Sequence, residues 1–443
     1  MRRTIILAKQ YWVLVLFCAS ILFPLPYFLL WFYFIQAVPA PNTNYHEQVN
    51  QIDAKITDAE RAWPIYREAM RSRLKELEAL NRASSVNKSP SEVKSLHDQD
   101  PEAWTSIVTT VEALHDVLEA VHHASSRTVL GLDLHPTYQD YSAEDQTFLF
   151  PHASMHRKPW DHGNASADIA VRVSKLHATS LATTLLPHTE MLRLLQGLLA
   201  ADLAIARQTQ DSERVVKNVE SGLGLARHFA NKRLAVESLL AEICVQCFLD
   251  ELQEIHADGA IKFNEEQKVR LKRAIEGLDV FALFEPAVEC SANYDLVQRF
   301  YTNNGNGDGH LTNDWLLLLR LTDQLNEGGT DLRPMPESTI DAIGEWVLRP
   351  FLIFAKPTRA EVMEILAQHE ELLRQAWRPP YNRQKIQEAC DQIKQAKLPV
   401  GMSNNYDYFV GVYDRLVLLE AKRRAILESL SLTQPESVHE VSQ

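Results

Sequence analysis

Cysteine is scarce in this 443-residue chain, with five in total. So few cysteines cannot form the disulfide network that holds small secreted domains together, so the fold must depend on a packed apolar core. Cys244 and Cys247 have the C-x-x-C spacing of redox proteins, but the surrounding LLAEICVQCFLDEL has the pattern of one amphipathic helix. A redox pair needs a strand, a turn and an exposed helix N-terminus. We interpret both cysteines as core residues.

Charged residues are absent between Lys9 and Glu47. A helix needs about 20 apolar residues to cross the hydrocarbon core of a bilayer, and residues 11–38 exceed that length. Aromatic residues gather at both ends of this run, where rings rest at the level of the lipid headgroups. The sequence therefore predicts a transmembrane anchor over residues 11–38, with the lipid bilayer as a partner.

Two other readings of the anchor are weaker. Val38-Pro39-Ala40 faintly resembles a signal cleavage site, but the apolar run is longer than the roughly 7–15 residues of a cleaved signal. A hairpin turning at Pro24 and Pro26 would leave arms of about 20 Å, too short for a core of about 30 Å. We favour one uncleaved, proline-kinked span.

The flanking charges predict the orientation of this anchor. Arg2, Arg3 and Lys9 precede it, while residues 39–46 carry no Lys or Arg. Because the positive flank stays in the cytoplasm, residues 1–10 should be cytoplasmic, and the body should lie in the periplasm or an equivalent compartment.

Strand patterns are nearly absent, and apolar residues recur at helical spacing, so the predicted fold is all-α. We expect one transmembrane helix followed by a multi-helix soluble body of stacked antiparallel helices. The predicted regions are a membrane-proximal helical region (39–130), an irregular His/Asp/aromatic segment (131–163), a helical body (164–430) and a disordered tail (431–443). Helices are expected near 45–82 (with one interruption at Pro64), 101–124, 185–208, 212–231, 233–259, 265–284, 285–300, 314–325, 336–354, 358–377, 382–397 and 406–430.

The irregular segment 131–163 gathers imidazoles and carboxylates. It contains His135, His152, His156 and His162 beside Asp133, Asp140, Asp145 and Asp161. Such groups can ligate zinc or iron, but no rigid H-E-x-x-H spacing occurs. A hydrolase or metal-dependent enzyme centred on this segment is the alternative function.

A second candidate site resembles part of a calcium-binding loop. Oxygen ligands fall at positions one, three, five and nine, with Gly309 at the sharp turn; the candidate metal residues are Asn304, Asn306, Asp308, His310 and Thr312. Trp315 stands where such loops have a bidentate glutamate. We interpret the loop as an interhelical turn and expect no cofactor, with calcium binding as a second alternative.

The runs Ala59–Tyr66 (AERAWPIY) and Leu185–Pro187, with the later Leu192-Arg193, resemble stretches of uncharacterised, membrane-anchored helical proteins from planctomycete-type bacteria. The turn at Asn304–Thr312 is also similar to theirs. The resemblance extends from about residue 59 onward, and it implies a bacterial envelope setting without supplying an activity.

Catalytic signatures are missing as well: there is no G-x-S-x-G, no G-x-G-x-x-G and no P-loop. The net charge of −13 repels nucleic acid, so we exclude it as a general partner. The leading hypothesis is a membrane-tethered scaffold or interaction protein that binds a protein partner or its own copies.

Overall fold

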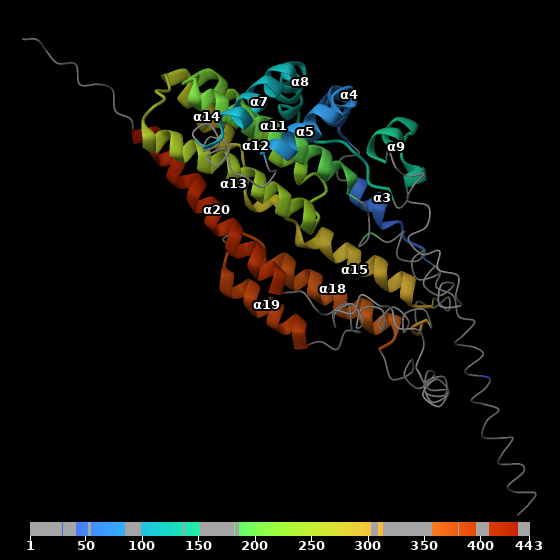
Figure 1. Ribbon diagram of the computed structural model, residues 1–443. Helices are drawn as coiled ribbons and strands as arrows, with labels where there is room; N and C mark the ends of the chain where they lie inside the picture. The colour runs from blue at the N-terminus through green and yellow to red at the C-terminus, as the bar shows by residue number, and fades with distance from the viewer. Residues whose placement is uncertain are drawn as a thin grey trace, which may run out of the picture.

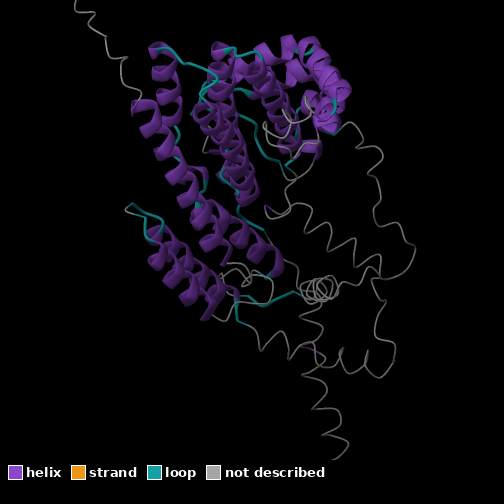
Figure 2. Ribbon diagram, turned by 60° about the vertical axis from the view of Figure 1, so that its left-hand side comes forward, coloured by secondary structure: helices purple, strands orange, loops and turns teal. Residues whose placement is uncertain are grey.

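The computed structural model of the chain describes residues 29, 41–51, 55–84, 99–135, 138–150, 181, 186–302, 309–312, 357–379, 381–395 and 407–432. These residues form a multi-helix body, as predicted, in which no strand occurs (Figure 2). The only β-type pairs within them are two isolated bridges, Arg61 with Val129 and Tyr301 with Leu311.

The helices of the first half are α3 (Tyr45–Asn50), α4 (Trp63–Arg71), α5 (Leu74–Ser84), α7 (Pro101–Ala113), α8 (His115–Ser125), α9 (Ala143–Leu149) and α11 (Pro187–Gln208). Those of the second half are α12 (Ser212–Phe229), α13 (Ala235–Asp258), α14 (Glu265–Glu276), α15 (Pro286–Phe300), α18 (Arg359–Ala376), α19 (Arg383–Gln395) and α20 (Asp407–Leu432). Short 3-10 turns lie at Asp58–Glu60, Tyr138–Asp140 and Phe281–Leu283.

Three helices, α8, α12 and α14, run parallel in a first layer. Glu119 of α8 pairs with Lys217 of α12, and one turn further His122 meets Ser221. Between α12 and α14, Ser212 meets Gln267 and Glu220 meets Arg270. Because contacts advance in the same direction along each pair, the C-terminal ends of all three helices lie on one side.

A second layer contains α11, α13 and α20, which run the opposite way. His188 and Arg207 of α11 contact Glu237 and Glu251 of α13. Along α20, Arg415 pairs with Glu242 of α13 and Lys422 pairs with Asp250. Figure 1 shows α20 lying along α13. A chain that alternates between two layers of parallel helices has the build of a helical array.

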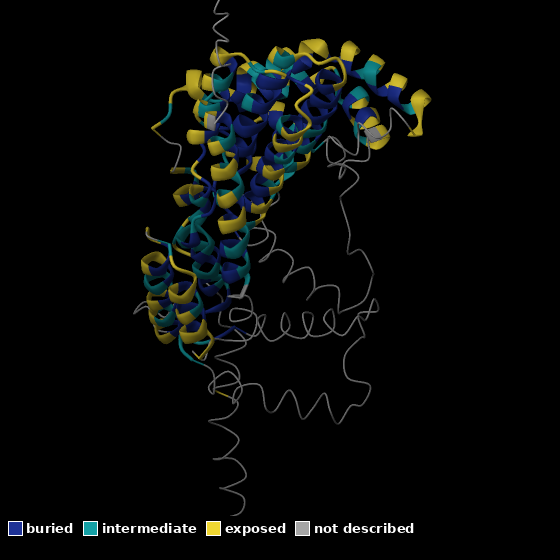
Figure 3. Ribbon diagram, turned by 90° about the vertical axis from the view of Figure 1, so that its left-hand side faces the viewer, coloured by how far each residue is buried: buried dark blue, intermediate teal, exposed yellow. Residues whose placement is uncertain are grey.

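The core lies where the two layers meet. Figure 3 shows buried residues along the inside of the helix stack and exposed residues on its outer faces. Helix starts are fixed by local caps: the Asp211 side chain accepts from the Arg214 backbone N–H at the start of α12, and Asn264 and Gln267 form a capping box on α14.

The C-terminal helices extend the stack beyond α20. Helix α19 packs on α20, α18 on α19, and α15 on α18, while α3 reaches α15. Aromatic rings join these parts: Phe281 stacks on Tyr381, and Phe284 meets Trp377 edge-on. The Gln298 side chain of α15 also bonds the backbone of Thr43.

The helix predicted over 45–82, with one interruption at Pro64, is instead three separate helices, α3, α4 and α5, and Pro64 lies within α4. The Ala62 and Trp63 backbone N–H groups donate to the carbonyl oxygens of Val129 and Leu130, which holds the chain extended before α4. Pro64 then lies in the first turn of α4, where its missing N–H costs nothing.

Other boundaries differ less. The helix predicted over 101–124 is divided at Leu114 into α7 and α8, and the segment 131–163 contains the helix α9. Within the helix predicted over 265–284, the observed helix α14 ends at Glu276. Predictions over 185–208, 212–231, 233–259, 285–300, 358–377, 382–397 and 406–430 are confirmed within a few residues, whereas 314–325 and 336–354 lie outside the described residues.

The predicted anchor at 11–38 also lies outside the described residues, apart from Leu29. Among the helices that the structure does describe, none is both long enough and apolar enough to cross a membrane.

Candidate functional site: a cationic cleft between α8, α12 and α14

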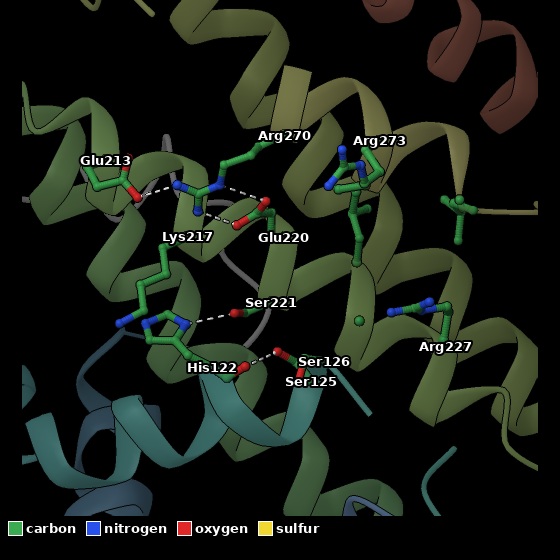
Figure 4. Close-up of a pocket in the computed structure, with 15 residues that line it drawn as sticks. His122, Ser125, Ser126, Glu213, Lys217, Glu220, Ser221, Arg227, Arg270 and Arg273 are labelled. Carbon is green, nitrogen blue, oxygen red and sulfur yellow. Dashed lines mark hydrogen bonds and ion pairs between the residues drawn. The ribbon is translucent and has the colours of Figure 1, made fainter. Parts of the chain in front are cut away.

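An open cleft of about 840 Å³ runs along α12, with α8 on one side and α14 on the other (Figure 4). Its lining comes from all three helices of the first layer and the turn after α14: His122, Ser125 and Ser126; Glu213, Lys217, Glu220, Ser221, Leu223, Gly224 and Arg227; and Arg270, Arg273, Ala274, Gly277 and Leu278. Most of these side chains are polar or charged.

A glycine sets how closely α8 and α12 approach. A Cβ atom on Gly224 would overlap the backbone carbonyl oxygen of Ser125. Because that oxygen belongs to the helix backbone, a larger side chain would have to push the two helices apart. Gly224 therefore determines the spacing of α8 and α12 at the floor of the cleft.

His122 and Ser221 join α8 to α12 inside the cleft, with 2.7 Å between Nδ1 and Oγ. Burial and the neighbouring Lys217 ammonium lower the pKa of His122 to about 4. The ring is therefore neutral at pH 7, so it does not interact as a cation with the C-terminal dipole of α8.

This His–Ser pair is not arranged for acyl transfer. Ser221 is 3% exposed and lies within α12, where the neighbouring backbone N–H groups are engaged in the helix. An oxyanion hole needs free donors aimed at the reacting atom, and α12 offers none beside Ser221. We interpret the pair as a contact between helices.

Arg270 is held by two carboxylates at one end of the cleft. Its Nη1 lies 2.5 Å from Glu213, and its Nη2 lies 2.6 Å from Glu220. These bonds raise the pKa of Arg270 above its ordinary value. Lys217 is likewise paired, 2.6 Å from Glu119. At this end, cationic charge is balanced within the protein.

Arg227 and Arg273 form the other end. Both are exposed, and neither guanidinium has an ion pair or hydrogen bond with any residue that the structure describes. Figure 4 shows them reaching the cleft from α12 and α14, away from His122 and Lys217. Each lies in the last turn of its helix, or next to it, where the helix dipole offsets part of its charge. The rest of the positive charge on these two guanidiniums is available to an external anion.

The predicted calcium residues lie elsewhere, and only two are described. Asn304, Asn306 and Asp308 fall outside the described residues. The His310 backbone carbonyl accepts from Thr302, and the Thr312 N–H donates to the Phe300 carbonyl at 2.8 Å. Thr312 is 1% exposed. Calcium binding by this loop stays a prediction.

The described part of 131–163 does not bring ligands together. Asp145 accepts hydrogen bonds from Trp63 and Arg67, Asp133 faces Lys232 at 3.7 Å, and His135 packs edge-on against Tyr141. No group of three or more His, Cys, Asp or Glu side chains suited to a metal occurs within the described ranges. His152, His156, His162 and Asp161 lie outside them.

The predicted core cysteines lie on α13 as free thiols. Cys244 is buried, and burial raises its pKa well above the ordinary value. Cys247 is partly exposed, and burial raises its pKa to about 12. A thiol whose pKa is raised stays protonated at pH 7, and the protonated thiol is a poor nucleophile. This agrees with a packing role for both cysteines.

Sequence reasoning missed the cleft. The signal was present, because Arg270 and Arg273 lie one turn apart on a charged helix and Arg227 ends another. Nothing in the sequence indicates that these helices lie side by side. Comparison with family models, with curated proteins and with solved structures found no match for the chain.

Proposed function

We propose that this chain is an interaction protein that is held in a membrane by residues 11–38 and binds its partner with the extracytoplasmic helical body. The observation that carries the proposal is the open cleft, in which Arg227 and Arg273 have no acidic partner among the described residues. Two guanidiniums that lie in a cleft without acidic partners suit the recognition of an anionic group.

The helical array supports the same function. Arrays of parallel helix layers present long surfaces that bind other chains. The His122–Ser221 pair, the one cleft feature that resembles catalytic chemistry, is a contact between helices. Membrane tethering rests on the uncharged run between Lys9 and Glu47.

The test is isolation of the full chain from membranes in mild detergent, with cross-linking before solubilisation and mass spectrometry of the products. We expect a defined partner or a homo-oligomer at constant stoichiometry. A clean monomer without associates would contradict the proposal.

Variants then locate the interface. In one, Arg227 and Arg273 are both replaced by Glu; in its control, Arg82 and Arg378, which are exposed but do not line the cleft, are replaced by Glu. We expect the first to lose the partner and the control to keep it. If both keep it, the interface lies outside the cleft, although the chain remains an interaction protein.

A further inference from the structure

The length of the cleft limits its ligand. It follows α12 from Glu213 to Arg227, which at 1.5 Å per residue is about 21 Å. An extended peptide of about six residues has the same length. A lone phosphate or carboxylate would occupy only one end.

Charge along the cleft is not uniform. At the end near Glu213, Arg270 is balanced by Glu213 and Glu220, and the Glu213 side chain is 58% exposed. At the end near Arg227, the guanidiniums of Arg227 and Arg273 have no balancing carboxylate among the described residues. A ligand lying along the cleft should therefore be anionic at one end and neutral or cationic at the other.

The charge of the whole chain disfavours long polyanions. A protein with a net charge of −13 repels nucleic acid and anionic bilayers over distances of about a Debye length. A short segment that places a few carboxylates on the two arginines brings little charge near the rest of the surface.

The middle of the cleft offers a donor for a peptide backbone. Nδ1 of His122 is engaged with Ser221, while Nε2 has no hydrogen-bond partner within the described part of the chain. When the Ser221 hydroxyl donates to Nδ1, the neutral ring carries its proton on Nε2. That N–H can donate to a carbonyl oxygen of an extended segment.

We propose that the cleft binds a short extended segment of a partner protein whose acidic residues, clustered at one end, lie on Arg227 and Arg273. The proposal rests on the proposed function and adds the chemistry of the partner. It commits the cleft to a peptide, with a small oxyanion or a phosphorylated headgroup as the competing outcome of the test.

The experiment is fluorescence anisotropy with the purified full chain in detergent. The probes are a labelled short peptide with glutamates at one end and alanines at the other, and the same peptide with glutamine at every glutamate. Inorganic phosphate and glycerol phosphate serve as competitors. We expect the glutamate peptide to bind, the glutamine peptide to bind at least about fivefold more weakly, and neither phosphate to compete at millimolar concentration.

Single substitutions assign the site. Arg227→Ser and Arg273→Ser should each lower the affinity for the glutamate peptide by about fivefold. Arg378→Ser, outside the cleft, should leave this affinity unchanged. Both cleft arginines are exposed, so the variants should keep the wild-type circular dichroism spectrum and Tm. His122→Phe, which removes the Nε2 donor, should lower the affinity for both peptides by the same factor.

Three results would overturn the proposal: equal affinity for both peptides or no binding of either, an affinity unaffected by the two cleft substitutions, or displacement of the glutamate peptide by either phosphate at millimolar concentration. If these appear while detergent isolation still recovers a stable partner, the interaction function stands and only the acidic peptide is wrong. If isolation yields only a monomer, the function itself is wrong.

Discussion

Tyr66 and Tyr301 are both fully buried, but their hydroxyl groups differ. The Tyr66 hydroxyl lies 2.9 Å from Nδ1 of His228, whereas the Tyr301 hydroxyl has no hydrogen-bond partner among the residues that the structure describes. Tyr66→Phe should lower the free energy of unfolding by about 1–2 kcal/mol, because it leaves a buried imidazole nitrogen unpaired. Tyr301→Phe should be neutral or stabilising, since it removes an unpaired polar group.

Urea unfolding followed by circular dichroism, in detergent at pH 7, compares these two variants with the wild-type chain. Equal losses in both would show that ring packing, and not the hydrogen bond, determines the cost.

His228 makes stability depend on pH. Burial lowers its pKa to about 4, below the roughly 6.5 expected in the unfolded chain. Above pH 6.5 the ring is neutral in both states. As the pH falls toward 4, only the unfolded chain binds the proton, so stability declines, by about 3 kcal/mol at the lower end of this window.

Urea titrations at pH 7 and pH 5 should therefore show a smaller loss of stability in His228→Gln than in the wild-type chain. His123→Gln, which replaces an exposed histidine of α8, is the matched control and should keep the wild-type pH dependence. An unchanged slope in His228→Gln would assign the pH effect to other groups.

At the scale of single elements, the sequence predicts helices better than their ends. The long helices α11, α12 and α13 follow directly from apolar periodicity. The separation of α3 from α4 does not follow from apolar periodicity, because it depends on backbone hydrogen bonds from Ala62 and Trp63 to residues 129 and 130. Pairing across that distance leaves no trace in local propensity.

The cleft could not be predicted for a related reason. His122 and Ser221 are 99 positions apart, and Arg270 lies 50 positions from Glu220. Each is an ordinary helix residue in its own segment. Their chemistry depends on three parallel helices meeting, which only the packing of the layers determines.

Gly224 tests that packing. Gly224→Ala should destabilise the chain by about 2 kcal/mol, because the added methyl group overlaps the Ser125 carbonyl oxygen of α8. Gly411→Ala on α20 is the control: its nearest neighbour is an arginine side chain at 3.7 Å, so higher helix propensity should raise stability by about 0.5–1 kcal/mol. Tm and urea midpoints measure both, and a gain in Gly224→Ala would refute a close contact between α8 and α12.

At the scale of the whole molecule, the orientation of the proposed anchor would decide which compartment the cleft faces. A phosphatase reporter that is active only outside the cytoplasm, fused after Ala40, should be active, because the positive charges of Arg2, Arg3 and Lys9 are expected to keep the N-terminus inside. Replacing these three residues with Asn should lower the activity by removing the charge bias. An inactive wild-type fusion would favour a hairpin and place the body in the cytoplasm.

The edge formed by α13 and α20 bears on how the protein is made. Arg415 pairs with Glu242 and Lys422 with Asp250, across 173 and 172 positions of the chain. At about 5–20 residues per second, a ribosome needs about 10–30 s to reach α20 after it has made α13. Throughout that interval the side of α13 that receives α20 lacks its partner helix, so the second layer is completed only after α20 has been made. A message cut short before α20 therefore yields a chain with an open helical edge, a substrate for chaperones and proteases.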